Sequence, residues 1–549
     1  MYEKVLAHQP RHSQALYLLG TLALQARDLR LAESMLGRAA IANPRHVPTL
    51  INLAMSLSQL DQHEQALDRI NRALELEPAS MPARTARLGM LVRASRASEA
   101  LQLFDELMAN GVQSAELWVN KGIAHIELGA PELAEQCFDH VLSLAPQHRD
   151  ALSQKVKLLI SRKQYAQALE LTDRCIAAMP DDAQAYANRG HALIELKRCV
   201  EAVGACERAC ALEPTVDRWA KLATALCSVE RVEEAEAAIE KARALDPEHP
   251  PLWVAAGHLL AKLGEHSSAV LNFDRFLAVR GKDNKVLMLK AVTLLNSGAY
   301  QQARDVLALC DGSDSEAFLS SCVYVCLMLA DWRDLQGRVE LLLSDVRAGR
   351  GVHAPFTLLA VVDDAALMRS AAQTWARDGG GDTAGQNDVV VPPRGKKLRI
   401  GYFSADFHHH ATCMLMAEVF ASHDRDQFEL FGFSFGLTGR DAMTERVAQS
   451  FDHFDEVRSW STERIVAQAR RYGLDIAVDL KGYTQQGRPA LFAQGCAPIQ
   501  VSYLGYPGTL GMPCMDYIIA DRVVIPPEHE VHYTEKVVRM PHSYQCNDS

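Results

Sequence analysis

A 34-residue periodicity is the feature of this sequence that most restricts its fold. Prolines recur at this spacing, and the last arrives one residue early: Pro10, Pro44, Pro78, Pro146, Pro180, Pro214 and Pro247. An alanine stands 22 residues after most of these positions. A small residue, such as Gly20 or Gly257, stands ten residues after several of them, and Gly122 stands ten residues after Val112, which occupies the one skipped slot. A fixed period of this length is typical of repeat architectures, in which each unit packs on its neighbours.

The residues between these markers predict paired helices. Apolar residues recur with helical spacing, as in "ALYLLGTLALQ". Small residues let two helices approach closely, and the proline ends the second helix because it cannot continue a hydrogen-bonded turn. The unit resembles the tetratricopeptide repeat, so we expect residues 1–315 to form an all-α, right-handed superhelix with a concave face. Its opening segment reads as the second helix of a repeat whose first helix is missing.

Asparagines recur on the first helix of alternate repeats, at Asn52, Asn120 and Asn188. One interpretation is that asparagine is a common consensus residue of the repeat. The other is a ladder of amides along the groove, since an amide can both donate to and accept from a peptide backbone of any sequence. The sequence leaves both open.

The pattern changes in the last third of the chain. Residues 316–377 favour a helical connector, and residues 378–397 are rich in Gly, Pro and polar residues, which predicts a linker. Residues 398–549 alternate short apolar runs, such as "LRIGYFS" and "LDIAVDL", with amphipathic stretches. This alternation predicts an α/β Rossmann-like lobe with a parallel sheet, whose ligands would bind beyond the carboxyl ends of the strands.

Three consecutive histidines, His408, His409 and His410, follow the first predicted strand. A metal site is one interpretation, although contiguous side chains in an extended loop point in different directions and no second ligand cluster supports it. The others are exposed histidines with no role, and one functional imidazole poised near neutral pH.

The composition argues against two classes of protein, nucleic-acid binders and membrane-spanning proteins. The net charge of −11 argues against a nucleic-acid binder, and no apolar run is long enough to span a membrane. The 13 cysteines are scattered through helical patterns, which favours reduced thiols in a cytoplasmic protein. We expect no metal and no cofactor.

Four motifs together carry a family resemblance. They are "LRIGYFSADFHHHAT", "VDLKGYT", "APIQVSYLGYPGTLGMPCMDYIIAD" and "YTEKVVRMPHSYQ". Following tetratricopeptide repeats, they resemble the O-linked N-acetylglucosamine transferase family, including its bacterial members and the SPINDLY branch. The resemblance implies the first half of a B-type glycosyltransferase fold. It also implies metal-independent, inverting transfer of a sugar, by default GlcNAc from UDP-GlcNAc, to Ser or Thr of protein acceptors.

The same resemblance suggests the site residues. The family's active-site histidine matches His410, with Asp406, Phe407 and Thr412 in register, while His408 and His409 fall on variable positions. The loop expected to shape the same cleft contains Gly482, Tyr483 and Thr484. The loop expected against the donor sugar contains Leu504, Gly505, Tyr506, Pro507 and Gly508. Asn52, Asn120 and Asn188 would line the acceptor groove, and His353 lies near the place of a further family histidine without aligning cleanly.

Two hypotheses remain open at this stage. The family's second lobe, which holds the nucleotide, has no counterpart in the sequence, so we expect a truncated transferase that is inactive alone. The alternative is a tetratricopeptide-repeat interaction scaffold whose transferase lobe is incomplete. The expected partners are protein or peptide acceptors and a UDP-sugar donor, with neither nucleic acid nor membrane.

Overall fold

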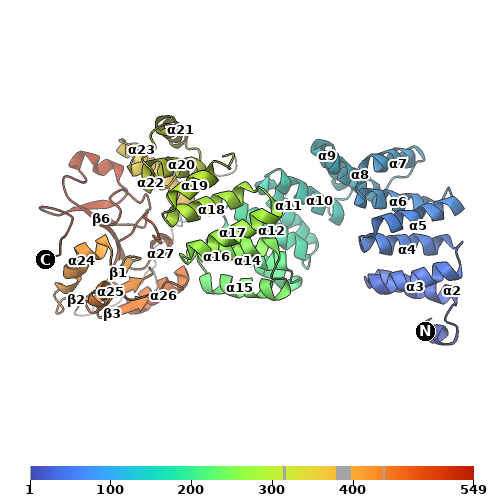
Figure 1. Ribbon diagram of the computed structural model, residues 1–549, viewed down its shortest axis with the longest axis horizontal. Coiled ribbons are helices and arrows are strands. Elements are labelled where there is room, and N and C mark those ends of the chain that lie inside the picture. The colour runs from blue at the N-terminus through green and yellow to red at the C-terminus, as the bar shows by residue number, and fades with distance from the viewer. Residues whose placement is uncertain (1, 313–316, 379–396, 437–438, 549) are drawn as a thin grey trace. The chain divides into compact units, whose positions relative to one another are not determined.

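A computed structural model describes residues 2–312, 317–378, 397–436 and 439–548. It separates into two compact units, residues 1–196 and residues 197–549 (Figure 1). This division falls within the predicted repeat array, and the domain boundaries at residues 315, 377 and 397 stay predictions. Residues 379–396 of the predicted linker lie outside the described residues.

The first unit is made of helices joined by short turns. In chain order they are α1 (Tyr2–His8), α2 (Ser13–Gln25), α3 (Leu29–Ala42), α4 (Val47–Gln59), α5 (His63–Leu76), α6 (Met81–Arg93), α7 (Ala97–Ala109), α8 (Ala115–Glu127), α9 (Pro131–Leu144), α10 (Arg149–Ser161), α11 (Tyr165–Ala178) and α12 (Ala183–Glu195). From α2 onward, consecutive helices pack as hairpins.

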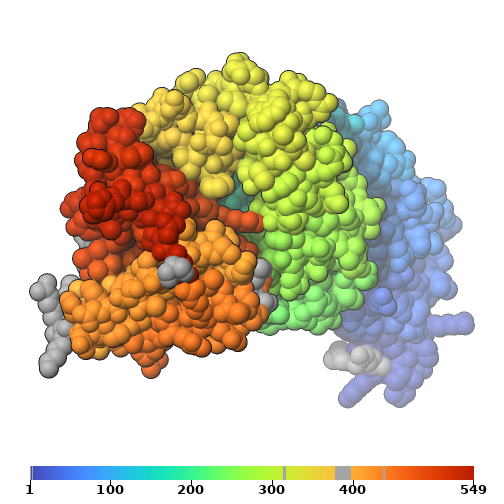
Figure 2. Space-filling model, turned by 60° about the vertical axis from the view of Figure 1, so that its left-hand side comes forward, coloured from blue at the N-terminus to red at the C-terminus, as the bar shows by residue number. Residues whose placement is uncertain are grey.

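The second unit continues the same pattern before its sheet begins. Its repeat helices are α13 (Cys199–Leu212), α14 (Val216–Ser228), α15 (Val232–Leu245), α16 (Pro250–Lys262), α17 (His266–Arg280), α18 (Asn284–Asn296) and α19 (Tyr300–Leu307). Four further helices follow, α20 (Phe318–Met328), α21 (Leu335–Arg347), α22 (Pro355–Leu359) and α23 (Ala365–Asp378). In Figure 2 these later helices, drawn in yellow, lie between the green repeats and the red carboxyl-terminal residues.

The markers of the repeat have the structural roles that the sequence predicted. The second helices α3 and α5 end two residues before Pro44 and Pro78. A Cβ atom added at Gly122 would lie 2.5 Å from the ring of Phe138, and one added at Gly257 would lie 2.6 Å from Phe273. These glycines therefore set how closely the two helices of a repeat pack.

The carboxyl-terminal lobe is built on a parallel sheet of seven described strands. They are β1 (Leu398–Ser404), β2 (Phe428–Ser434), β3 (His453–Glu456), β4 (Ile476–Asp479), β5 (Ile499–Tyr503), β6 (Tyr517–Ala520) and β7 (Lys536–Arg539). Their order is β3-β2-β1-β4-β5-β6-β7. The associated helices are α24 (Ala411–Ala421), α25 (Ala442–Ala448), α26 (Thr462–Tyr472), α27 (Ala490–Ala493) and the 3₁₀ helix η1 (Pro527–His532).

This architecture confirms the predicted fold class of a repeat array followed by a Rossmann-like lobe. The strand order reverses between β1 and β4, since the chain runs outward from β1 to β3 and then returns to β4 on the other side. Such a reversal is the switch point at which open α/β sheets bind ligands. Within the described residues, no helix is long and apolar enough to cross a membrane.

Candidate functional site

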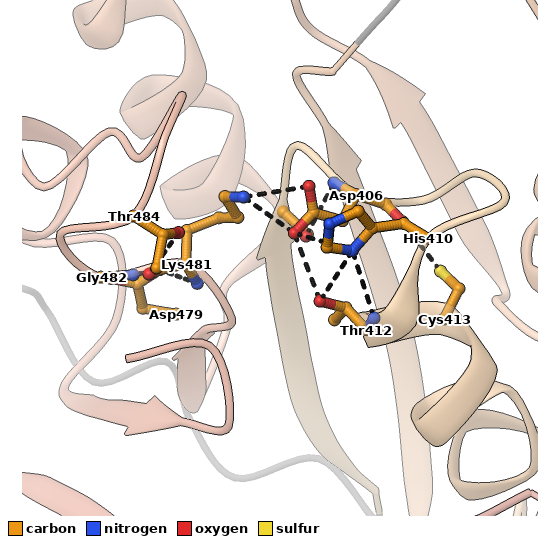
Figure 3. A network of polar contacts seen from close by, with 9 residues as sticks. Asp406, His410, Thr412, Cys413, Asp479, Lys481, Gly482 and Thr484 are labelled. Atoms are coloured by element: carbon orange, nitrogen blue, oxygen red, sulfur yellow. Dashed lines mark hydrogen bonds and ion pairs between the residues drawn. The ribbon is translucent and has the colours of Figure 1, made fainter. Parts of the chain in front are cut away.

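A buried ion pair joins the two strand ends at the switch point (Figure 3). Asp406 follows β1 and Lys481 follows β4. The Lys481 Nζ atom lies 3.0 Å from Oδ1 and 2.8 Å from Oδ2 of Asp406. Both side chains are more than nine-tenths buried, with 7% and 8% of their surfaces exposed. Because breaking such a pair would leave one buried charge unpaired, each residue fixes the other's position.

His410 lies beside this pair at the start of α24. It occupies the N-cap position, and its Nδ1 atom accepts the backbone N–H of Thr412 at 3.2 Å. A nitrogen that accepts a hydrogen bond must carry the lone pair, so the proton of the neutral ring is on Nε2. The Thr412 hydroxyl in turn donates to Oδ2 of Asp406 at 3.3 Å. His410 therefore presents an Nε2–H donor, while its other nitrogen is held by the helix.

The electrostatics of the loop keep this imidazole neutral. Burial lowers the pKa of His410, and the Lys481 ammonium and His408 lower it further, while Asp406, whose Oδ2 lies 3.5 Å from Nδ1, acts in the opposite direction. The His410 side chain is still 44% exposed. A neutral, accessible imidazole is suited to hydrogen bonding with a polar substrate at physiological pH.

The three histidines have different surroundings. The backbone N–H of His408 donates to the Asp406 carbonyl at 2.7 Å, and that of His409 donates to Oδ2 of Asp441 at 2.7 Å. The rings of His408 and His410 lie 5.7 Å apart. Among the described residues, no three His, Cys, Asp or Glu side chains are grouped so that they could hold a metal ion.

The loop after β4 is tightly folded. Oδ1 of buried Asp479 accepts the backbone N–H groups of Lys481 at 2.8 Å and Gly482 at 3.1 Å. Burial raises the pKa of Asp479 despite these two hydrogen bonds. Gly482 has a φ of 54°, a conformation that favours glycine, and the Thr484 hydroxyl donates to the Lys481 carbonyl at 2.8 Å. The predicted residues Gly482 and Thr484 thus belong to the same turn as Lys481.

The loop after β5 lies against the loop after β4. A Cβ atom added at Gly505 would lie 2.1 Å from the Leu480 carbonyl oxygen, so only glycine allows this approach. Tyr506 is 1% exposed and packs against Tyr483, with ring centroids 5.6 Å apart. Its side chain belongs to the core, whereas Pro507 of the same loop is exposed and can meet a ligand with its side chain.

Further residues of the same loop are held by a carboxylate that sequence reasoning missed. Glu535, which precedes β7 and is 4% exposed, accepts the Thr509 hydroxyl at 2.6 Å and the Leu510 N–H at 2.7 Å. Gly508 is buried, and a Cβ atom there would lie 2.8 Å from the Tyr506 ring. Leu504 has a φ of 65°, a strained conformation for a branched side chain.

The predicted amides lie on first helices of repeats in the first unit. Asn52 on α4 donates to the Thr21 hydroxyl of α2 at 3.0 Å, and Oδ1 of Asn188 on α12 accepts from Gln184 at 2.9 Å. Asn120 lies on α8, facing Gly89 of α6. All three are partly exposed. His353, in contrast, is 5% exposed and precedes the short helix α22.

Sequence reasoning did not find the Asp406–Lys481 pair. Asp406 entered only as a motif residue, and Lys481 only as the edge of a loop. The available signal was an acidic and a basic residue after two predicted strands, but the pairing depends on β1 and β4 being neighbours in the sheet.

Comparisons with known proteins find similarity along both parts of the chain. Residues 386–549 match the family described as Glycosyl transferase family 41. Tetratricopeptide-repeat models match residues 1–47, 47–80, 115–148, 154–216 and 254–315. The chain thus combines segments that match tetratricopeptide repeats with a segment that matches this glycosyltransferase family, in agreement with the resemblance.

Curated relatives carry related names. A "Probable UDP-N-acetylglucosamine--peptide N-acetylglucosaminyltransferase SEC" from Arabidopsis thaliana is 38% identical over 153 residues, covering 28% of this chain and 16% of the relative. A Caenorhabditis elegans "UDP-N-acetylglucosamine--peptide N-acetylglucosaminyltransferase" is 30% identical over 236 residues, covering 40% of this chain and 20% of that protein. The matched region therefore spans a fifth or less of these relatives.

A solved structure of a Thermobaculum terrenum O-GlcNAc transferase mutant is also similar. It is 22% identical, with 60% of this chain and 58% of that chain covered and a TM-score of 0.37.

Proposed function

We propose that this chain provides the repeat array and an α/β lobe of a protein O-glycosyltransferase. The reaction would transfer GlcNAc from UDP-GlcNAc to Ser or Thr hydroxyls of proteins. The observation that supports this most is the position of His410, Asp406 and Lys481 at the switch point of a sheet in a family 41 lobe. The donor and the acceptor class follow from the names of the relatives.

The proposed chemistry is a direct displacement at the sugar. The acceptor hydroxyl oxygen forms a bond to the anomeric carbon as the bond to the UDP phosphate oxygen breaks, which inverts the configuration. The electron pair of the broken bond leaves with UDP, and the hydroxyl proton passes to the departing diphosphate or to solvent. We assign no metal to this step, in line with the family resemblance. The Nε2–H of His410 would donate a hydrogen bond to an oxygen of the sugar or the acceptor, and the ion pair of Asp406 and Lys481 would hold the loop that carries it.

The supporting residues would have distinct parts. Pro507 and the backbone of Leu504, Gly505 and Gly508 would lie against the sugar, since glycine allows close approach. Gly482, Tyr483 and Thr484 would shape the neighbouring wall, and Thr412 would orient His410. Asn52, Asn120 and Asn188 would hold an extended acceptor through hydrogen bonds to its backbone. We place the reaction in the cytoplasm.

To test this, the natural protein would be incubated with UDP-[³H]GlcNAc and a mixture of acceptor proteins. We expect label in protein that alkaline β-elimination releases, as for a sugar on Ser or Thr, and we expect the labelling to persist in EDTA. A His410→Asn variant is the control for label unrelated to the site. Label that never enters protein would contradict the proposal and favour an interaction scaffold.

A further inference from the structure

The loop from Leu480 to Pro489 forms an ion pair at each of its two ends. At its start, Lys481 forms the buried ion pair with Asp406. At its end, the Nε atom of Arg488 lies 3.0 Å from Oε2 of Glu230. Glu230 belongs to the repeats, in the turn between α14 and α15, where its φ is 61°. One short loop therefore connects a repeat turn with the switch point of the sheet.

The Glu230 carboxylate and the Arg488 guanidinium each make further hydrogen bonds besides their ion pair. Its Oε2 atom also accepts the Thr462 hydroxyl at 2.9 Å. The Arg488 guanidinium donates in addition to the Trp460 carbonyl at 3.2 Å and to the Thr462 hydroxyl at 3.1 Å. The side chains of Arg488 and Glu230 are 10% and 23% exposed. These additional hydrogen bonds and the low exposure of both side chains fix the geometry of the ion pair.

The Glu230 carboxylate stays charged in this setting. Burial raises the pKa of Glu230, but the charges of Arg488 and Lys262 and the hydrogen bonds from Thr462 and Arg488 outweigh it and hold the pKa below its usual value. The pair is therefore ionic at neutral pH.

The loop between its two ends is compact enough to transmit a displacement. The Thr484 hydroxyl donates to the Lys481 carbonyl, and the Gly487 N–H donates to the Thr484 carbonyl at 3.0 Å. A Cβ atom added at Gly487 would lie 2.1 Å from the Gly482 carbonyl oxygen. The backbone thus folds on itself, and the Arg488 end is linked to the Lys481 end through direct contacts.

Other contacts between the repeats and the lobe are more exposed. Arg464 lies 2.8 Å from Glu233, with side chains 51% and 58% exposed. Exposed Gln485 donates to the Asn296 carbonyl at 2.6 Å. Solvent-exposed ion pairs contribute little to stability. In Figure 2 the orange lobe lies directly against the green repeats. Of the contacts described here between them, the Arg488–Glu230 pair is less exposed than the Arg464–Glu233 pair.

We propose that Glu230 is a positioning residue of the switch-point site. By binding Arg488, it fixes the loop that places Lys481 against Asp406, and so sets the surroundings of His410. The repeats would then act on the site through this loop as well as by holding a polypeptide.

The test compares Glu230→Ala and Glu230→Gln with Glu233→Ala, which removes the exposed pair of the same interface. Hydrogen–deuterium exchange would be measured on peptides covering residues 480–489. We expect about tenfold faster exchange in Glu230→Ala, a smaller increase in Glu230→Gln, and less than twofold in Glu233→Ala. Unchanged exchange in a folded Glu230→Ala variant would overturn the proposal, as would a uniform increase over the whole second unit. If Glu230→Ala fails to fold, Glu230→Gln decides by the same criteria.

A second measurement distinguishes a role of Glu230 in positioning Lys481 from a general effect on the stability of the fold. Modification of His410 by diethylpyrocarbonate would be followed against pH by mass spectrometry, in a background with His408→Gln and His409→Gln. A displaced Lys481 would leave Asp406 uncompensated, so we expect the His410 pH profile to shift upward in Glu230→Ala and to stay in place in Glu233→Ala. An unmoved profile in Glu230→Ala would contradict the proposal. Both readouts are independent of sugar transfer, so they can fail or succeed whatever the outcome of the transferase assay.

Discussion

The ammonium group of Lys481 lies within 3.0 Å of both carboxylate oxygens of Asp406, across 75 residues of sequence. The pair joins the carboxyl ends of β1 and β4, where the strand order of the sheet reverses. Its removal should therefore affect both the stability of the lobe and the arrangement of His410.

Substitutions at the two positions of this pair should not have additive effects on stability. Lys481→Met leaves the buried Asp406 carboxylate without its counter-ion, and Asp406→Asn does the same to the Lys481 ammonium. We expect each substitution to lower the unfolding free energy by roughly 3 kcal/mol. The double variant should lose at least about 2 kcal/mol less than the sum of the two. Urea unfolding followed by tryptophan fluorescence measures this. Strictly additive losses would show that the two side chains are not coupled.

Among the three histidines, His410 should matter most for sugar transfer. His410→Ala removes both the Nε2–H donor and the N-cap of α24, and we expect a roughly 10²-fold loss of transfer. His408→Ala and His409→Ala should have much smaller effects, because these two residues bind Asp406 and Asp441 through their backbone N–H groups, which alanine keeps. Steady-state kinetics on folded variants tests this, and equal losses at all three positions would favour a shared site.

The amides of the first unit should contribute to peptide binding. Asn120→Ala combined with Asn188→Ala removes two partly exposed polar groups without enlarging a core cavity. At about 1 kcal/mol for each hydrogen bond, we expect affinity for an acceptor polypeptide to fall roughly tenfold or more. Fluorescence anisotropy would measure it, with Asn272→Ala on a second helix, whose amide bonds to its own helix at Ser268, as the matched control. Unchanged affinity would show that these amides do not bind the acceptor polypeptide.

His258 on α16 should make the second unit sensitive to acid. Burial lowers the pKa of His258 to about 4, with a smaller contribution from Lys262. The unfolded state then binds the proton more tightly, so this contribution to stability is complete above the unfolded pKa of about 6.5 and is lost as the pH falls. Between pH 6.5 and 5 the loss should be roughly 1.6 kcal/mol.

His258→Asn cannot take up this proton, so its stability should change less over the same pH range. Urea midpoints at a series of pH values provide the comparison. Parallel pH dependence in the original and the variant would show that other groups cause the acid sensitivity.

Much of the fold could be predicted because its signals are local in sequence. The 34-residue step located the hairpins, and the small residues at Gly122 and Gly257 marked where helices pack, since Phe138 and Phe273 fill the space opposite. The predicted apolar runs match strands β1, β2, β4, β5, β6 and β7. The short strand β3, His453–Glu456, was missed, because an edge strand pairs through its backbone and "HFDE" has little apolar pattern.

The site was harder to predict because its contacts are distant in sequence. His410 was found through its motif, but its role as an N-cap depends on where α24 begins. The partners of Lys481 and Arg488 are set by the order of the strands and by the packing of the lobe on the repeats, which no local pattern encodes. The core position of Tyr506 was also not evident, since an aromatic residue in a glycine-rich loop can face either way.

The contact between Gly505 and the Leu480 carbonyl has a consequence for ligand affinity. It places the backbones of two switch-point loops against each other, and the hydrogen bonds that Asp479 and Glu535 accept from backbone N–H groups fix each loop separately. Their conformational entropy is therefore lost when the protein folds. A ligand that docks on this surface does not have to order it, so more of its contact energy remains as binding affinity.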